Sequence, residues 1–473
     1  MANLRHLLKD TAIYGLSSIV GRFLNYLLVP LYTHCMPTSS GDYGISTNVY
    51  AYVALILVIL TFGMETTLFR FGSDEKARPD TVFSTSFALV AALSLAFLAL
   101  VAGFITPISE ALGYEAHHSY LLMMAAVVCM DAMQAIPFSY LRLRKQPIRF
   151  ASLKLLFIVL NIALNCLYFL VLHKTQVYYI FLVNLWCTAF VSLLFLPMLF
   201  RIRWRVDWRL LRRMLSYSWP LLVLGIAGIL NQTADKVIFP LVYPDKQEAQ
   251  VQLGIYGACV KIAMIMAMIT QAFRYAYEPI VFAKQRDKDA KEYYASAMKF
   301  FLIFTLLAFL CVVGYMPLLK HIIGAGYREG LRVVPIVMGA EIMMGVYFNL
   351  SFWYKLIDRT IYGAWFSAAG CLVLFAVNIW GIPRYGYMAC AWGGFAGYGV
   401  AMVLSYIVGQ RKNPIRYPLR SMAVYTLLAL VLFLCMQYTA KSLTTPWQLC
   451  LNTGLILAFA LYIVREALPL RRR

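Results

Sequence analysis

The sequence predicts an all-α, polytopic membrane protein, and three observations support this fold class. Of the 473 residues, 62% are hydrophobic and only 13% are charged, and the mean hydropathy is +0.71, which excludes a soluble globular chain. Apolar windows of about 20 residues recur along the chain, as membrane-crossing helices require. These windows are continuously apolar and do not alternate with period two, so a transmembrane β-barrel is also excluded.

The apolar windows, bounded by charged or Pro/Gly-rich loops, predict about fourteen helical spans. The expected spans of the first half are Thr11–Tyr32, Tyr43–Met64, Thr81–Ile105, Ser119–Leu141, Phe150–Leu172, Val177–Phe200 and Met214–Tyr243. Those of the second half are Gln252–Pro279, Ala295–Leu319, Leu331–Tyr354, Ile361–Gly381, Gly386–Gly409, Leu419–Tyr438 and Pro446–Val464. The first run lacks a small-residue cleavage pattern, so we expect a retained span and not a removed signal peptide.

Positive charge in the loops predicts the orientation. With the amino terminus in the cytoplasm, the loops on that side hold about 29 Lys and Arg residues, and the loops on the other side hold about 7. We therefore expect both termini to be cytoplasmic. The net charge of +21 mostly follows from this topology and predicts contact with membrane lipid headgroups. It does not indicate nucleic-acid binding, because the sequence shows no fold or aromatic-basic platform for that purpose.

Motifs of enzymes and metal proteins are absent from the sequence. The ten cysteines show no C-x-x-C pair, and the six histidines lie in predicted loops or interfaces. There is no Walker sequence and no G-x-S-x-G elbow, which argues against ATP hydrolysis by that route and against a serine hydrolase. We therefore expect no catalytic residues, no metal and no cofactor other than a coupling ion, H⁺ or Na⁺.

The chain divides near its centre at the basic segment RIRWRVDWRLLRRM, Arg201–Met214. Trp204 and Trp208 lie one helical turn apart there, so the segment is expected to form a linking helix along the cytoplasmic interface or to be a simple stop-transfer cluster. We expect two pseudo-symmetric six-helix lobes, residues 1–205 and 206–418, followed by a two-helix hairpin over residues 419–473.

A weak internal repeat relates the two halves. The first span ends with VPLY (Val29–Tyr32) before a loop with DYG (Asp42–Gly44), and the seventh ends with FPLVY (Phe239–Tyr243) before a loop with GIYG (Gly254–Gly257). In each half a Tyr-Gly pair is expected to open the next helix. Duplicated helical bundles commonly place a transport site at their interface, so the repeat predicts that these four spans line a cavity.

Two blocks of sequence resemble a known family. They are KDTAIYGLSSIVGRFLNYLLVPLYTHCMPTSSGDYG with FGMETTLFRF in the first half, and LRRMLSYSWPLLVLGIAGILNQTADKVIFPLVY with GIYGACVKIAMIMAMITQAFRYAYEPIVF in the second. Both blocks are similar to the polysaccharide flippases of the multidrug/oligosaccharidyl-lipid/polysaccharide (MOP) exporter superfamily. Span number and loop layout agree over nearly the whole chain, whereas the segment after Ala295 carries little that is diagnostic.

The resemblance implies a two-lobed transporter of the bacterial inner membrane. It would flip undecaprenyl-pyrophosphate-linked oligosaccharide, such as an O-antigen (lipopolysaccharide) or capsule repeat unit, from the inner to the outer leaflet by alternating access. A lipid II flippase and a multidrug or cation antiporter are alternatives in the same superfamily. Glycan polymerase or assembly proteins are expected partners, as are membrane lipids.

A different class, an integral-membrane glycan polymerase or glycosyltransferase, is disfavoured by the loops. Such enzymes generally need a sizeable external domain or loop for acceptor chemistry. The longest expected external loops, around Tyr243–Gln252 and Lys320–Leu331, are of about ten residues, close to ordinary connection length.

Arg22 is the strongest candidate for the substrate site. A permanent cation near the middle of a span costs about 3 kcal/mol on insertion scales, so its presence indicates a function. Tyr14, Ser18, Arg22 and Asn25 follow helical spacing and share one face of the first span. A guanidinium offers a planar fork of donors to a pyrophosphate. The alternative is that Arg22 pairs with a carboxylate and locks two helices.

A second polar face is expected on the neighbouring span. Its members are Tyr43, Thr47, Tyr50, Thr61 and Glu65. Two such faces on adjacent helices predict a wet cavity. Tyr14, Tyr26 and Tyr50 are candidates for stacking on sugar rings in that cavity.

In the seventh and eighth spans, Asp235 and Lys261 are expected at similar depth on consecutive antiparallel helices. One expectation is that Asp235 and Lys261 form a structural ion pair. The alternative is that Lys236 and Lys261 face the cavity as phosphate ligands and that Asp235 adjusts how strongly they bind phosphate. Arg274 and Glu278, one turn apart, are expected to form an interfacial ion pair, and a further possibility makes Arg274 an entrance cation for the headgroup.

Carboxylates inside the spans are candidates for ion coupling. Asp131 and Glu341 lie near the centres of the fourth and tenth spans with no evident partner, and a desolvated carboxyl group can take up H⁺ or Na⁺ during a transport cycle. Asp235 and Glu278 are further candidates. The alternative for Asp131 and Glu341 is a neutral acid that hydrogen-bonds a neighbouring helix.

Overall fold

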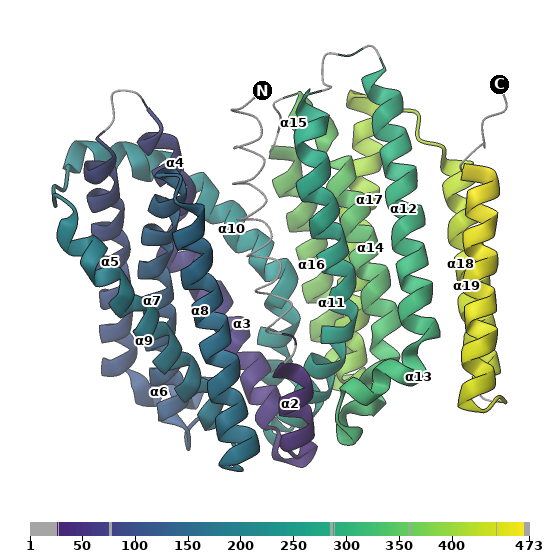
Figure 1. Cartoon of the computed structure of the whole chain (residues 1–473), viewed down its shortest axis with the longest axis horizontal. Coiled ribbons are helices and arrows are strands. Elements are labelled where there is room, and N and C mark those ends of the chain that lie inside the picture. The colour runs from purple at the N-terminus through teal and green to yellow at the C-terminus, as the bar shows by residue number, and fades with distance from the viewer. Residues whose placement is uncertain are drawn as a thin grey trace. The chain divides into compact units, whose positions relative to one another are not determined.

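The computed structural model describes residues 26, 28–74, 78–283, 287, 289–357, 359, 361–440 and 442–467, of which 275, 276, 278, 279, 282, 283 and 467 are described in their backbone alone. All regular elements in these residues are helical (Figure 1). Thirteen of the described helices are long and apolar enough to cross a membrane. The prediction of an all-α polytopic membrane protein is therefore confirmed, and only the first expected span lies mostly outside the described residues.

The chain forms two compact units, Met1–Gly254 and Ile255–Arg473. The helices of unit 1 are α2 (Leu28–Cys35), α3 (Asp42–Thr61), α4 (Met64–Gly72), α5 (Pro79–Gly103), α6 (Ile105–Leu112), α7 (His118–Leu143), α8 (Pro147–Cys166), α9 (Val177–Arg201) and α10 (Trp208–Val242). Helix α7 packs against α3, α5 and α9. The core between them contains Phe83, Phe138 and Phe195, and the last two rings meet edge-on at 4.9 Å.

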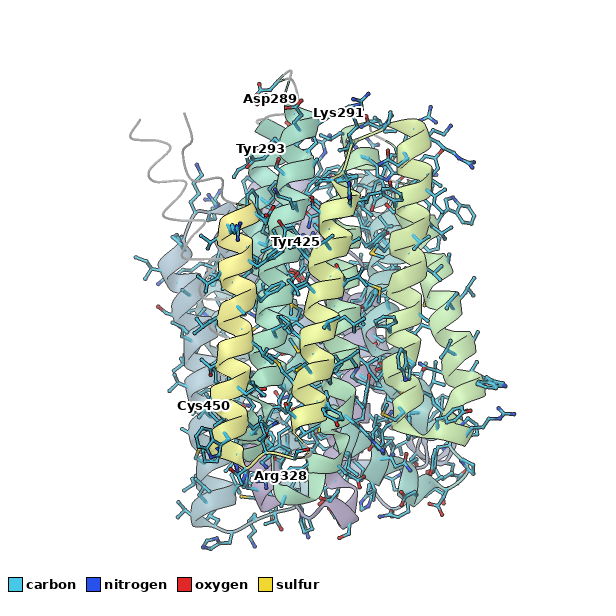
Figure 2. All side chains as sticks on the ribbon, turned by 90° about the vertical axis from the view of Figure 1, so that its right-hand side faces the viewer. Asp289, Lys291, Tyr293, Arg328, Tyr425 and Cys450 are labelled. Atoms are coloured by element: carbon cyan, nitrogen blue, oxygen red, sulfur yellow. The ribbon has the colours of Figure 1, made fainter. Side chains whose placement is uncertain are left out.

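Helix α11 (Lys246–Ala283) begins in unit 1 and continues into unit 2. The other helices of unit 2 are α12 (Ala290–Gly314), α13 (Met316–Leu319), α14 (Val334–Leu350), α15 (Phe352–Leu356), α16 (Ile361–Tyr385), α17 (Tyr387–Lys412), α18 (Leu419–Thr439) and α19 (Thr445–Ala467). Helices α18 and α19 stand side by side (Figure 2) and both pack against α12. The expected lobe boundaries at residues 205 and 418 stay a prediction.

Helices α16 and α17 pack closely because glycines lie between them. A Cβ atom at Gly370 would lie 2.6 Å from the carbonyl oxygen of Gly397, and one at Gly397 would lie 2.7 Å from the carbonyl oxygen of Gly370. Small residues that let two backbones approach are a common basis of helix association in membranes. The pair gives unit 2 a rigid framework.

The expected second span is broken. Phe62 and Gly63 adopt left-handed backbone angles, with φ values of 50° and 67°, so α3 ends at Thr61 and α4 begins at Met64. The prediction that Glu65 continues the polar face of Tyr50 along one helix is therefore wrong. The glycine at position 63 permits this break, because it adopts positive φ without steric cost.

The basic segment between the halves also differs from the expected linking helix. Residues 202–207 are not helical, and α10 begins only at Trp208. The Asp207 carboxylate accepts hydrogen bonds from the backbone N–H groups of Arg209 and Leu210 at 2.9 and 3.1 Å. This N-cap fixes where the helix starts.

The two repeat motifs meet in unit 1. A Cβ atom on Gly44 would lie 1.7 Å from the carbonyl oxygen of Gln250, and one on Gly254 would lie 3.0 Å from the Gly44 nitrogen. The backbones of α3 and α11 are therefore in contact. The Tyr-Gly pair opens α3 as expected, but α11 already begins at Lys246, and the expected ten-residue loop from Tyr243 shrinks to residues 243–245. The other expected loop, at 320–331, is largely 3₁₀-helical.

Candidate functional site

Unit 1 holds a cluster of ionisable side chains inside its membrane spans, hereafter the unit 1 polar cluster: Glu65 on α4, Asp131 on α7 and Lys154 on α8. The ammonium of Lys154 acts electrostatically on both carboxylates, and its Nζ atom lies 4.1 Å from the centre of the Phe138 ring. Asp131 also interacts with the Thr188 hydroxyl. Asp131, expected to stand alone, therefore has neighbours on α8 and α9.

Lys154 and its relation to Glu65 were missed by sequence reasoning. Lys154 lies one turn or more inside an apolar helix that begins at Pro147. A charged residue inside an apolar span is the same sequence signal that marks Arg22. Opposite charges on separate helices, in a low-dielectric environment, attract each other more strongly than in water. Lys154 and the two carboxylates therefore stabilise one another's charges inside unit 1.

Tyr50 lies at the edge of the same region of unit 1. Its hydroxyl oxygen accepts a hydrogen bond from Asn184 at 2.8 Å, and its ring meets Phe181 edge-on at 6.1 Å. Thr188 lies on α9, as Asn184 does, and its carbonyl accepts a hydrogen bond from Gln134 of α7 at 2.9 Å. Tyr50 is therefore part of a line of polar side chains between α3, α7 and α9. Its stacking on a sugar ring stays a prediction.

Asp235 and Lys236, adjacent on α10, form an ion pair. The Lys236 ammonium donates to the two carboxylate oxygens of Asp235 at 3.0 and 3.1 Å, and to the Gln232 carbonyl at 3.1 Å. The side chains are 20% and 10% exposed for Lys236 and Asp235. An anion that binds Lys236 must therefore compete with the carboxylate of its neighbour.

A buried polar network fixes the backbone at Lys236. Asn48 of α3 donates through Nδ2 to the Lys236 carbonyl at 2.7 Å. The Tyr114 hydroxyl donates to Asn48 Oδ1 at 2.6 Å and accepts from Gln250 at 3.4 Å. Burial raises the pKa of Tyr114 far above its usual value, so this hydroxyl stays protonated and remains a donor. Sequence reasoning missed Asn48 and Tyr114, which hold α10 against α3.

In unit 2, cations gather on aromatic rings. The Arg274 guanidinium of α11 lies 3.9 Å from the centre of the Phe348 ring, and the Lys355 ammonium lies 4.9 Å from the same centre. Cation–π contacts of this kind stabilise a charge in a partly desolvated place. Lys355 was not predicted. Lys261 on α11 and Glu341 on α14 are both half-buried.

Several predicted site residues lie outside this description. Tyr14, Arg22 and Asn25 fall outside the described residues, as does the side chain of Glu278. The expected pair of Asp235 and Lys261 joins residues of different units. The roles of these residues stay predictions.

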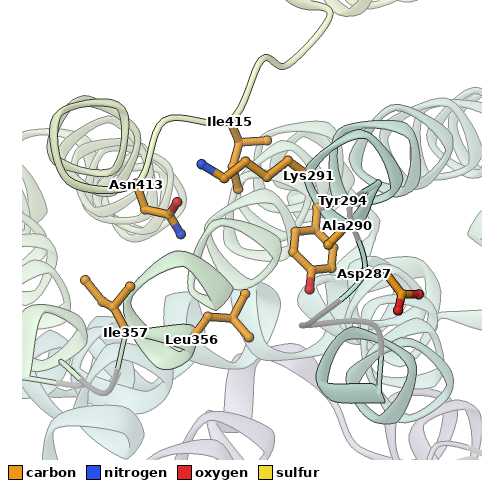
Figure 3. Close-up of a pocket in the computed structure, with 8 residues that line it drawn as sticks. All are labelled: Asp287, Ala290, Lys291, Tyr294, Leu356, Ile357, Asn413 and Ile415. Atoms are coloured by element: carbon orange, nitrogen blue, oxygen red, sulfur yellow. The ribbon is translucent and has the colours of Figure 1, made fainter.

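A pocket of about 310 Å³ lies in unit 2, at the end where α12 begins (Figure 3). Its lining residues are Asp287, Ala290, Lys291, Tyr294, Leu356, Ile357, Asn413 and Ile415. None of them is a predicted site residue. Lys291 lies at the opposite end of unit 2 from Arg328 (Figure 2). Within the described ranges, no group of three or more His, Cys, Asp or Glu residues could hold a metal ion.

Apolar spans that carry fixed cations and carboxylates are typical of polytopic membrane proteins with a site inside the membrane. Residues 7–282 match the family described as polysaccharide biosynthesis protein, which is more than half of the chain. The chain belongs to this family. No curated protein sequence matches it significantly.

Solved structures with a similar fold include a lipid II flippase and multidrug transporters. The lipid II flippase MurJ in an inward closed conformation matches with a TM-score of 0.77 at 14% identity, covering 96% of this chain and 99% of that one. An inward-facing multidrug resistance MATE family transporter of the MOP superfamily matches with a TM-score of 0.65 at 14% identity, covering 83% and 94%. An outward-facing multidrug resistance MATE family transporter matches with a TM-score of 0.59 at 13% identity, covering 85% of this chain and 95% of that one.

The resemblance found in the sequence is therefore confirmed at the level of family and fold. The chain is a multi-pass membrane protein of this family, and it has the fold of these flippase and transporter structures. The expectation of a role in polysaccharide biosynthesis is confirmed at the level of family.

Proposed function

We propose that the chain flips undecaprenyl-pyrophosphate-linked oligosaccharide, of the O-antigen or capsule type, from the inner to the outer leaflet of the bacterial inner membrane. Family membership over residues 7–282 is the observation that carries this proposal. Both termini are proposed to be cytoplasmic, and glycan polymerase or assembly proteins are proposed partners.

Fixed positive charge inside the spans supports an anionic cargo. Lys236, Lys261 and Arg274 lie on the long apolar helices α10 and α11, together with Arg22 in the first predicted span. A lipid pyrophosphate offers several acceptor oxygens and concentrated negative charge, which guanidinium and ammonium groups bind well. These cations are proposed to hold the pyrophosphate while two lobes alternate in access to the two leaflets.

An ion gradient, of H⁺ or Na⁺, is proposed to reset the carrier. Asp131 is the first candidate for the coupling site, because Lys154 and Thr188 surround it within unit 1. A carboxylate beside an ammonium can exchange its partner for a proton or sodium ion when the surroundings change. Glu341, Asp235 and Glu278 are the remaining candidates.

The test is transport of a defined lipid-linked oligosaccharide in reconstituted vesicles. Arg22→Ala, with expression and gel-filtration profile verified, is expected to abolish translocation, and Arg22→Lys is expected to restore it partly, because Lys keeps the charge but loses the planar fork. Full activity of the Ala variant would remove Arg22 from the site.

A lipid II flippase is the second candidate, favoured by the TM-score of 0.77 to MurJ over 96% of this chain. Both cargoes carry a lipid pyrophosphate, so the basic groups cannot distinguish them. The same vesicles loaded with lipid II or with a longer lipid-linked glycan separate the two functions. Preference for lipid II would replace the first proposal.

A further inference from the structure

Six arginines between α9 and the first turns of α10 present an uncompensated positive surface on unit 1. They are Arg201, Arg203, Arg205, Arg209, Arg212 and Arg213, and all six are exposed. Among the described residues, none of the six forms an ion pair. The one acidic residue of the segment, Asp207, uses its carboxylate to cap α10. We name residues 200–219 the arginine face.

The backbone that carries these arginines is held in place. The Trp204 indole donates to the Leu199 carbonyl at 2.9 Å, and its ring meets Phe87 edge-on at 5.5 Å. The backbone N–H of Asp207 donates to the Thr85 hydroxyl at 3.2 Å, and Ile202 is buried. The guanidinium groups therefore extend from a fixed support. A preorganised site loses less entropy on binding than a solvated loop does.

Large aromatic side chains accompany the arginines. Phe200 is 83% exposed, Trp208 76% and Trp219 60%. Along α10, Trp208, Arg212 and Trp219 are separated by four and seven residues, so they share one side of the helix. Exposed tryptophans beside the end of an apolar span settle at the level of lipid headgroups. This places the guanidinium groups among phosphates.

We propose that the arginine face binds the headgroups of anionic phospholipids in the leaflet on its side of the membrane, and that transport depends on them. The ligand is a phosphodiester of the bilayer and not the cargo, so the inference goes beyond the proposed function. A guanidinium fork donates two parallel hydrogen bonds to phosphate oxygens. Basic residues next to a span each strengthen binding to an anionic membrane roughly fivefold.

The test compares two variants that lose the same charge. Arg203→Gln/Arg205→Gln/Arg209→Gln removes three arginines of the face, and Arg411→Gln/Lys412→Gln/Arg416→Gln removes three exposed cations at and just beyond the end of α17 in unit 2. The full chain is placed in phosphatidylcholine vesicles with rising shares of brominated phosphatidylglycerol. Quenching of Trp208 fluorescence, taken as the difference from a Trp208→Phe background, reports lipid contact.

We expect the first variant to weaken phosphatidylglycerol binding about 100-fold, which is the product of three such contributions, and the unit 2 variant to bind like the wild type. Transport by the wild type should rise with the phosphatidylglycerol share, and this rise should disappear only in the first variant. Unchanged quenching in the first variant overturns the proposal, as does equal loss in both variants, which indicates a general charge effect.

Two further arms keep the outcome unambiguous. Arg203→Lys/Arg205→Lys/Arg209→Lys, which keeps the charge, should retain most of the binding. Equal loss of binding in the Lys and Gln variants, both with unchanged gel-filtration profiles, would contradict binding through positive charge and overturn the proposal. Competition with undecaprenyl pyrophosphate separates lipid from cargo. If it displaces the brominated lipid stoichiometrically, the face belongs to the cargo site and the proposal fails. The quenching does not require transport, so it can fail or succeed independently of the proposed function.

Discussion

At the scale of single residues, the ion pair of Asp235 and Lys236 decides how available one candidate phosphate ligand is. The Lys236 ammonium contacts both carboxylate oxygens at 3.0 and 3.1 Å. A hydrogen bond to a charged group contributes about 1.5–3 kcal/mol. An arriving pyrophosphate must replace this contact, so Asp235 acts as a competitor that also favours release.

Substituting Asp235→Asn should therefore strengthen binding of undecaprenyl pyrophosphate by about tenfold and slow net transport. Equilibrium binding to the purified protein measures the first effect, and vesicle transport measures the second. Lys236→Gln provides the opposite change and should weaken binding. If Asp235→Asn leaves the affinity unchanged, Lys236 does not contact the pyrophosphate.

The unit 1 polar cluster leads to a second prediction. Because Lys154 acts on Asp131 and Glu65 across helices, neutralising one member leaves an opposite charge uncompensated inside the membrane region. In a double-mutant cycle with Asp131→Asn and Lys154→Gln, we expect a coupling free energy of about 1 kcal/mol or more. Unfolding of the detergent-solubilised variants measures it.

Additive effects of the two substitutions would contradict an interaction between Asp131 and Lys154. Ser152, exposed on the same helix as Lys154, offers a matched control, because Ser152→Ala combined with Asp131→Asn should be additive.

The sequence could identify charged residues at membrane depth but not their neighbours. Lys236 and Asp131 were recognised from their apolar surroundings alone. The contact of Lys236 with Asp235, its neighbour in the chain, depends on side-chain direction, and that of Asp131 with Lys154 depends also on the packing of α7 against α8. Lys154 and Asn48 were not predicted as site residues, because a single polar residue in a span does not show which side chains it faces.

At the scale of helices, the contact between α3 and α11 is the tightest crossing in unit 1 that glycines make. A side chain at Gly44 has no room, since its Cβ would lie 1.7 Å from the Gln250 carbonyl oxygen. Gly103, at the end of α5, has nothing within 4 Å of the same position. These two glycines test whether the crossing matters.

We expect Gly44→Val to destabilise the protein by roughly 3 kcal/mol or more, because the overlap is with backbone and cannot be relieved by a rotamer change. Gly103→Ala should be neutral or stabilising by about 0.5 kcal/mol, since alanine reduces the entropy of the unfolded chain. Thermal unfolding followed by gel filtration compares them. Equal midpoints for the two variants would show that α3 and α11 can separate here without cost.

Helix positions follow closely from composition, and helix ends do not. Spans such as Val177–Arg201 and Leu419–Thr439 begin at the expected residues because apolar length decides them. The break at Phe62 and Gly63 and the early start of α11 at Lys246 depend on backbone angles and on contacts with α3, which a hydropathy window does not contain. The N-cap at Asp207 fixes the start of α10, whereas the basic segment around it predicts a linking helix or a stop-transfer cluster without an exact first residue.

At the scale of the whole molecule, the fold class and the family predicted from the sequence are confirmed. The orientation in the membrane stays a prediction from loop charge. Within unit 2, Lys291 and Arg328 lie at opposite ends (Figure 2). Glu329, next to Arg328, and Lys291 are both exposed. The positive-inside rule places the Lys291 end in the cytoplasm.

A membrane-impermeant maleimide applied to intact spheroplasts tests this orientation. In a background with the exposed thiols at Cys435 and Cys450 replaced by Ser, Glu329→Cys should be labelled at once. Lys291→Cys should be labelled only after the membrane is permeabilised, because its loop is expected to be cytoplasmic. The reverse pattern would invert the topology, place the arginine face at the external leaflet and remove the proposed path from the inner to the outer leaflet.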